Sequence, residues 1–320
     1  MKFGIALPNS GPLASVSNID RLAVEAEELG FDALLVHDHI SYDTEWLGHR
    51  TSGLAQPHAE IEPDLYESLT TLAYAAAATR TIRLGTSILV LPLRDPRVAA
   101  RQIITLQALS RGRLSLGVGS GDYPTEFRVM QTPYREKAAY TREHLEALRA
   151  ILPGGRAGYR GKHVAFENGS FFPRVAPIPI LMGGGIRANP RTGDQELFEP
   201  PIHTLARTCD GWIPEGPPEL IGEGVALIAR LRREYGRHEV DMEIRAQSPL
   251  YLGDDQTAMA RLGRGNDFEL AGSIDTVMGL LDRYREAGVD AMNLRCFADD
   301  ETSYYSMIRT FAREIMPVFQ

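Results

Sequence analysis

The sequence predicts an α/β protein, a (β/α)8 TIM barrel with insertions at its C-terminal mouth, and two observations support this fold. First, helix-like stretches end in a Gly or polar stop, then Asp-Ala or Asp-Gly, then a short apolar run, as at 29–33, 287–291 and, more loosely, 209–211. Repeated helix-to-strand joins of this kind indicate a parallel sheet. Second, strand-like segments alternate with helices through all 320 residues, a length that suits one barrel.

The expected elements follow one another in a regular order. The eight strand candidates are apolar runs at residues 2–7, 33–37, 82–87, 113–118, 178–182, 211–213, 243–249 and 291–295. Between them, apolar residues recur at helical spacing, as in Ile19, Leu22, Ala26 and Leu29. Ser273 is suited to cap the last helix before the final strand. Eight alternating strands favour a closed barrel over an open doubly wound sheet.

Three stretches depart from this repeat. Residues 41–64 and 184–201 are long and follow predicted strands, so they are expected over the C-terminal mouth, where long loops tend to be functional. Residues 154–177 have the pattern of a small hairpin. Because no stretch has the composition of a linker, residues 1–320 are predicted to form a single domain.

Composition and charge argue against several classes of function. The chain is 43% hydrophobic, and its net charge of −8 disfavours a nucleic-acid or anionic-membrane surface. Cys209 and Cys296 match no metal or redox spacing, so buried thiols in a reducing compartment are expected. The chain starts directly in a strand, with no secretion signal or membrane-spanning run, and a cytoplasmic protein is therefore the expectation.

Asp38 and His39 directly follow the second predicted strand. At the C-terminal end of a barrel strand, both side chains can reach the mouth. His39 is a candidate proton donor or acceptor, and a neighbouring carboxylate would set the tautomer of its ring. A lone histidine is more often structural, so the functional interpretation depends on this position.

Two strands end in glycine-rich turns, Gly119-Ser120-Gly121 before Asp122 and Gly183-Gly184-Gly185 before Arg187. Such glycines let backbone amides approach a flat ring or an anion, although a ligand-free tight turn is equally compatible. The first turn is not the dinucleotide fingerprint, because its spacing differs and a loop rather than an immediate helix is expected after it. Asp122 could act as an acid, orient a substrate or cap the next segment, and Arg187 could neutralise a phosphate or remain a solvated surface residue.

Ser87 and Ile88 end the third predicted strand. A bulged backbone there could press against one face of a planar ring, and a plain buried strand is the alternative. Hydrolase and metal sites are not indicated, because the sequence has no nucleophile elbow, no His-Glu-x-x-His and no P-loop, and no metal ligand is assigned.

These residues, in this order, resemble the bacterial-luciferase-like superfamily, which comprises luciferase-like monooxygenases and F420-dependent oxidoreductases. The resemblance covers nearly the whole chain and is carried by the order and spacing of segments 2–5, 26–32, 38–39, 83–88, 112–119 and 210–212. It implies a TIM barrel that binds its cofactor at the C-terminal mouth, usually as a homodimer. The segments around His39 and Ser87 are most similar to those of enzymes that use the deazaflavin coenzyme F420.

The resemblance also implies roles for individual residues. It places a cis peptide between Ser87 and Ile88 against the ring, makes His39 the acid or base, and maps the acidic partner onto Asp122. The expected cofactor contacts are Asp38, Ser87, Ile88, Gly119, Ser120, Gly121, Gly183, Gly184, Gly185 and Arg187. Asp122 replaces the Glu of the sugar-phosphate dehydrogenases and Asp43 replaces an aromatic residue, which puts a sugar-phosphate substrate in doubt.

The predicted function is hydride transfer between F420 and a small organic substrate bound at the mouth. This chemistry requires the substrate carbon to stack on one face of the ring and one proton to be managed, a task that suits His39. An FMN-dependent luciferase-like monooxygenase that uses O2 is the alternative, and a non-catalytic flavin-binding barrel is the third possibility.

Overall fold

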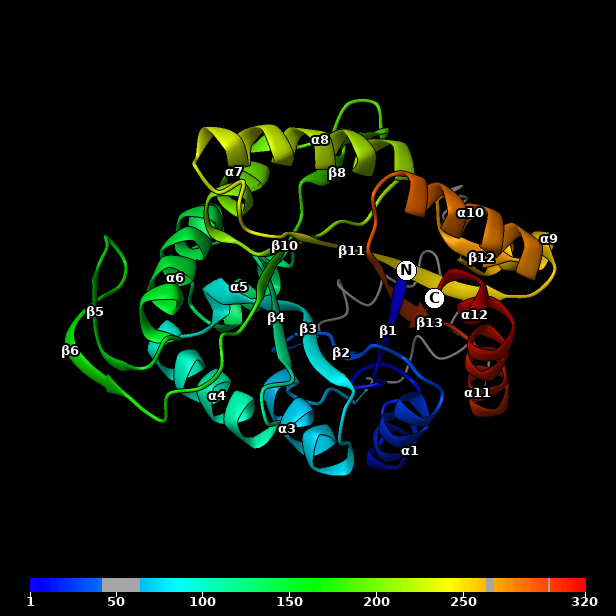
Figure 1. Cartoon of the computed structure of the whole chain (residues 1–320), viewed down its shortest axis with the longest axis horizontal. Coiled ribbons are helices and arrows are strands. Elements are labelled where there is room, and N and C mark those ends of the chain that lie inside the picture. The colour runs from blue at the N-terminus through cyan, green and yellow to red at the C-terminus, as the bar shows by residue number, and fades with distance from the viewer. Residues whose placement is uncertain (42–63, 263–267, 299) are drawn as a thin grey trace.

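The computed structural model describes residues 1–41, 64–262, 268–298 and 300–320, and in it parallel strands close into a barrel surrounded by helices (Figure 1). The barrel strands, in order around the ring, are β1 (Lys2–Ala6), β2 (Ala33–Val36), β3 (Arg83–Val90), β4 (Leu114–Gly119), β7 (Ile180–Gly183), β10 (Gly211–Ile213), β11 (Glu243–Leu252) and β13 (Ala291–Cys296). β13 pairs with β1 and so closes the ring. The predicted (β/α)8 TIM barrel is confirmed, and each predicted strand segment overlaps one of these strands.

Helices follow the strands and cover the outside of the barrel (Figure 1). They are α1 (Val16–Glu28), α3 (Ser68–Ala78), α4 (Pro96–Leu109), α5 (Pro124–Val129), α6 (Lys137–Ile151), α7 (Glu199–Thr208), α8 (Pro218–Glu234), α9 (Asp255–Leu262), α10 (Ile274–Glu286), α11 (Glu301–Thr310) and α12 (Met316–Phe319), with short helical turns η1 (Leu91–Leu93), η2 (Tyr134–Glu136) and η3 (Phe311–Ile315). Ser273 caps α10 as predicted, since its hydroxyl accepts a hydrogen bond from the Thr276 backbone N–H at 3.3 Å.

The insertions agree with the predictions only in part. Strands β5 (Gly155–Arg160) and β6 (Ala165–Phe171) form the expected antiparallel hairpin, which projects from the side of the barrel (Figure 1). The segment 184–201 is not only a loop, because β8 (Ile186–Ala188) and β9 (Gln195–Leu197) form a second hairpin within it. The short strand β12 (Leu270–Gly272) pairs with β11 and was not predicted. Residues 42–63 of the first predicted lid, including Asp43, lie outside the described residues.

A chain of polar side chains runs through the barrel interior. Near the strand starts, Arg245 is buried and pairs with Asp32 and Glu243 at 2.5 and 2.7 Å. Arg245 also donates to Asn293 Oδ1 at 3.2 Å, and the Asn293 amide lies 3.4 Å from Ser87 Oγ, closer to the mouth. These paired polar groups lie beside apolar side chains such as Leu35 and Ile213 and lead toward the C-terminal ends of the strands.

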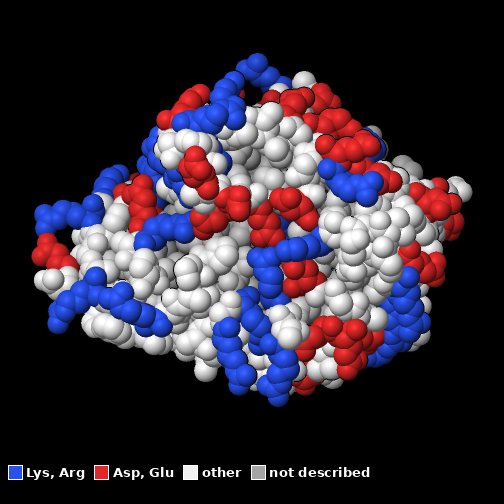
Figure 2. Space-filling view, in the orientation of Figure 1, with Lys and Arg blue, Asp and Glu red and all other residues white. Residues whose placement is uncertain are grey.

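The surface and the thiols are also relevant to the predictions. Basic and acidic side chains are intermixed on the face seen in Figure 2. Among the helices in the described ranges, none is long and apolar enough to cross a bilayer.

Both cysteines are free; burial raises the pKa of the Cys209 thiol to about 11 and that of the Cys296 thiol to about 12.

Candidate active site

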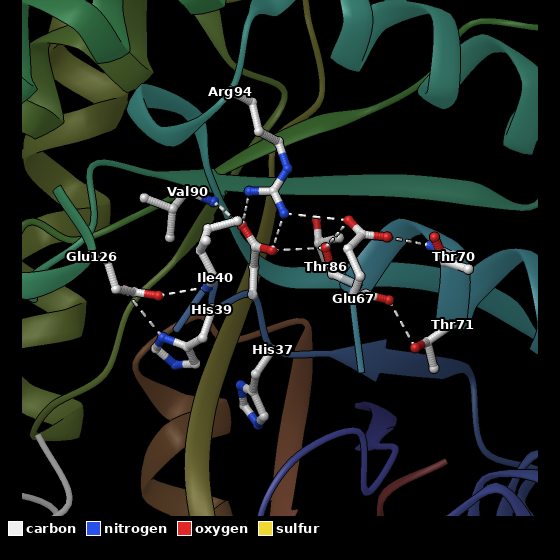
Figure 3. Close-up of polar contacts among 12 residues, drawn as sticks. His37, His39, Ile40, Glu67, Thr70, Thr71, Thr86, Val90, Arg94 and Glu126 are labelled. Atoms are coloured by element: carbon white, nitrogen blue, oxygen red, sulfur yellow. Dashed lines mark hydrogen bonds and ion pairs between the residues drawn. The ribbon is translucent and has the colours of Figure 1, made fainter. Parts of the chain in front are cut away.

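His39 lies just past the C-terminal end of β2, where Glu126 of α5 reaches it (Figure 3). His39 Nδ1 is 3.3 Å from Glu126 Oε2, and Glu126 Oε1 accepts the Ile40 backbone N–H at 2.6 Å. The side chains are 13% and 2% exposed, respectively. A carboxylate at Nδ1 favours the tautomer with the proton on that nitrogen, which leaves the basic lone pair on Nε2. The pair is therefore arranged as an oriented acid–base group.

Glu126 was missed by the sequence predictions, which expected a loop after the glycine-rich turn. α5 begins at Pro124, two residues beyond Asp122. Proline at the first position of a helix, followed by an acidic residue in the first turn, is a recognised helix-start signal. That signal identifies the helix, but only the tertiary structure shows that Glu126 points toward His39.

Asp38 forms a buried ion pair with Arg94. Both Nη atoms of Arg94 donate to the carboxylate at 2.5 Å, and the Val90 backbone N–H and the Ser68 hydroxyl each donate at 2.8 Å. These four hydrogen bonds join the ends of β2 and β3 to the start of α3. The structure thus gives Asp38 a set of protein partners that occupies its carboxylate, and its place close to the ring of a cofactor stays a prediction.

The peptide between Ser87 and Ile88 is cis, as predicted, and the pairing of β3 with β4 shifts register there. The side chain of Ile88 lies over two glycines. A Cβ placed on Gly119 would be 2.5 Å from Ile88 Cδ1, and one on Gly183 would be 3.0 Å from Ile88 Cγ2. The glycines at these strand ends therefore make room for Ile88, and the three strands together present one apolar surface, which we call the Ile88 platform (Ile88, Gly119 and Gly183).

The glycine-rich turn after β4 is tied to α6. Lys137 Nζ donates to the Gly121 carbonyl oxygen at 2.6 Å and lies 3.3 Å from the Asp122 carboxylate. Asp122 is 88% exposed in its side chain, so among the described contacts it is Glu126, not Asp122, that pairs with His39. Ser120 is half-buried between the two glycines.

The second glycine turn lies at the neighbouring strand end. Gly184 and Gly185 have φ values of 96° and 91°, a left-handed backbone that suits glycine. Arg187, beyond them, donates to Glu196 Oε1 at 3.0 Å and its guanidinium lies 4.0 Å from the centre of the Phe198 ring. The charge of Arg187 is therefore already offset within the β8–β9 hairpin.

The ends of β2, β3, β4 and β7 thus bring together several predicted residues, namely His39, Ser87, Ile88, Gly119 to Gly121 and Gly183 to Gly185. Asp38 lies buried in its ion pair with Arg94, while Asp122 and Arg187 are exposed and paired with other side chains. Across the residues that the structure describes, no group of three or more His, Cys, Asp or Glu side chains is placed to hold a metal ion.

Known proteins resemble this chain in both sequence and structure. An uncharacterised protein of Mycobacterium tuberculosis is 32% identical over 245 residues, which are 74% of this chain and 80% of that protein. An F420-dependent glucose-6-phosphate dehydrogenase of Kineococcus radiotolerans is 30% identical over 167 residues, 51% of this chain and 45% of that enzyme. The solved structure of an F420-dependent secondary alcohol dehydrogenase, with an F420–acetone adduct, matches with a TM-score of 0.80 at 15% identity, covering 100% of this chain and 99% of that one.

Solved structures with this fold include an FMN-bound monooxygenase as well as F420-dependent enzymes, so the fold is compatible with either cofactor. The enzymes named among these relatives are all oxidoreductases, which supports this class of enzyme for the chain. The profile of the family described as luciferase-like monooxygenase matches residues 1–264. Since this match spans most of the sequence, the chain belongs to the luciferase-like monooxygenase family.

Proposed function

We propose that the protein transfers a hydride between F420 and a small organic substrate, and that His39 moves the accompanying proton. The observation that carries the proposal is the His39–Glu126 pair, a half-buried imidazole with a buried carboxylate at 3.3 Å. Oxidation of an alcohol carbon releases one hydride and one proton, and the reverse reaction consumes both. A single oriented imidazole is sufficient to accept or supply that proton.

The Ile88 platform suits a flat ring system. Ile88 and Gly183 are half-buried and Gly119 is buried beneath Ile88, and a Cβ at Gly119 would collide with the Ile88 side chain. When bound, F420 would supply the hydride carrier. Ser87, Ile88 and the two glycine turns would hold F420 at the ends of β3, β4 and β7. Arg187, which the β8–β9 hairpin positions beside the second glycine turn, would lie near the charged tail of F420. The platform would fix the ring so that one face is open to the substrate.

F420 is favoured over FMN by the sequence relatives. The F420-dependent glucose-6-phosphate dehydrogenase is 30% identical to this chain over half its length, whereas the FMN-bound monooxygenase is 17% identical and so supports the fold alone. Fluorescence titration of the cofactor-free protein with each compound tests this choice. We expect a dissociation constant for F420 in the range of about 1–10 μM, and binding of FMN at least about tenfold weaker. Micromolar binding of FMN, with none of F420, would reverse the assignment.

Three variants test the proton role. The assay follows the absorbance of F420 during its reduction with a panel of small alcohols. His39→Gln should lower the turnover rate about 100-fold, because the group that transfers the proton is removed. Glu126→Gln should lower it about tenfold, because the imidazole remains but loses the carboxylate that orients it. Asp122→Asn is the matched carboxylate control, since Asp122 was the acid predicted from the sequence. Cofactor affinity should stay within about twofold throughout. Parent-like turnover in both the His39 and Glu126 variants would refute the proposal, and a large loss in Asp122→Asn would return the acid role to Asp122.

A further inference from the structure

A second polar cluster lies across the mouth from His39, on the arc formed by β10, β11 and β13. Glu215 follows β10 by two residues, Gln247 lies in β11, and Arg295 lies near the end of β13. Gln247 Nε2 donates to Glu215 Oε2 at 2.8 Å, and Arg295 Nη2 donates to Glu215 Oε1 at 2.7 Å. Both oxygens of Glu215 are thus used to hold two side chains from neighbouring strands.

The register of the strands places this cluster at the mouth. Asn293 faces the barrel interior, where it contacts Ser87 and Arg245. Because side chains alternate along a strand, Arg295 faces the same way, one layer nearer the C-terminal end. Gln247 pairs with Asn293 across the sheet, and its Oε1 accepts the Ser87 hydroxyl at 2.9 Å. A hydrogen bond therefore connects this cluster directly to Ser87, the residue before Ile88.

Among the described residues, no acceptor faces one buried donor of Arg295, its Nε–H. Its side chain is 13% exposed, and its Nε is buried without a hydrogen-bond partner among the residues that the structure describes. A buried N–H without an acceptor is unfavourable, and a ligand that supplies the acceptor recovers the lost hydrogen bond.

The charge of Arg295 is offset by Glu215 at 2.7 Å. An anionic ligand group at Nε would be attracted by the guanidinium and repelled by the carboxylate beside it, whereas a neutral oxygen needs only the donor. We propose that Arg295 determines substrate specificity by donating a hydrogen bond from Nε to a neutral carbonyl or hydroxyl oxygen of the substrate, and that Glu215 disfavours carboxylate and phosphate groups there. This inference rests on the proposed function, because it takes the mouth to be the substrate site.

Two probe compounds of similar shape test the proposal: cyclohexanone, which is neutral, and cyclohexanecarboxylate, which is anionic. Each is titrated into the cofactor-loaded protein while the cofactor absorbance is followed. The parent should bind the ketone at least about tenfold more tightly. Arg295→Lys keeps a cation for Glu215 but removes the Nε–H, so it should weaken ketone binding about tenfold. Glu215→Gln keeps a hydrogen-bond acceptor but removes the negative charge, so it should strengthen carboxylate binding about tenfold.

Arg128→Lys, at an exposed arginine of α5, is the matched control and should change neither affinity. Preference of the parent for the carboxylate, or absence of ketone binding to it, would overturn the proposal. So would variants at Arg295 and Glu215 that lower the unfolding temperature yet leave the ratio of ketone to carboxylate affinity unchanged, since that is the result of a purely structural role. If the protein binds FMN instead of F420, the proposed function fails, but the same titrations on the FMN-loaded protein still decide the role of Arg295.

Discussion

The buried ion pair between Asp38 and Arg94 can be tested by removing its cation. In Arg94→Met, the fully buried carboxylate of Asp38 keeps the Val90 N–H and the Ser68 hydroxyl but loses both guanidinium donors. Removing one partner of a buried ion pair costs about 3–5 kcal/mol. Glu67, which Arg94 also contacts at 3.3 Å, is 38% exposed and can be solvated by water, so the cost arises mainly at Asp38. For a protein of 320 residues we expect the unfolding temperature to fall by about 4–8 °C.

A second substitution separates the charge from the loss of packing. Asp38→Asn keeps an oxygen that can accept the Val90 N–H but carries no charge, and it therefore does not need the guanidinium. The double variant Asp38→Asn/Arg94→Met should be more stable than Arg94→Met alone by about 1–3 kcal/mol, because the uncompensated buried charge is gone. The two substitutions are then strongly non-additive, as expected for residues in direct contact.

Urea unfolding of the parent, both single variants and the double variant at one pH measures this coupling. The slope of the unfolding free energy against urea concentration should be unchanged, so that the midpoints report stability directly. A cost below about 1 kcal/mol for Arg94→Met, or a double variant whose cost equals the sum of the two single costs, would refute the reasoning. Either result would mean that the Asp38 carboxylate is not held by the charge of Arg94.

Three further predictions concern the carboxylate of Glu27, the glycine beneath Ile88 and the reactivity of the Cys209 thiol. Burial raises the pKa of Glu27, but hydrogen bonds from the backbone N–H groups of the turn before β3 outweigh it and hold that pKa at about 2, against 4.5 normally. Glu27→Gln should thus lower the unfolding temperature at pH 7, and the difference from the parent should vanish as the pH falls from about 4.5 toward 2; a pH-independent difference contradicts this. Gly119→Ala should weaken cofactor binding about tenfold in the fluorescence titration, because the new methyl group displaces Ile88. The double variant Gly119→Ala/Ile88→Val should bind the cofactor as the parent does, and parent-like affinity of Gly119→Ala alone argues against the platform. Because Cys209 is buried and its pKa is raised to about 11, it should react with a thiol reagent only slowly at pH 8 and rapidly in denaturant, and rapid reaction of Cys209 in the native protein would contradict its burial.

The barrel could be predicted from sequence because its signals are local. Gly30, for example, has a φ of 82°, the left-handed conformation that the helix-to-strand join requires. The β8–β9 hairpin and β12 were missed because strands of three residues are too short to show a periodicity, and these three strands, unlike the equally short β10, lack the Asp-Gly join that marked residues 209–211. Such strands exist only because their pairing partners lie nearby in the folded chain.

The site was less predictable, because its contacts join residues far apart in sequence. His39 could be found from its place at a strand end, but its partner Glu126 lies 87 residues later and the ion partner of Asp38 lies 56 residues later. Asp122 was predicted as the acid because the family resemblance maps the acidic residue after the glycine turn onto it. In the structure it lies on the exposed side of that turn, whereas the next helix turns Glu126 inward.

Ser87 and Ile88 connect the two halves of the proposed site. The Ser87 hydroxyl donates to Gln247, which belongs to the cluster around Arg295, while Ile88 forms the platform proposed for the ring. Adjacent residues on a strand normally face opposite sides, yet the register shift after Thr86 lets these two serve neighbouring parts of the mouth. A substrate held by Arg295 and a ring held by Ile88 would then be positioned by the same short segment of β3. The relative placement of the reacting groups would therefore depend on this segment of β3.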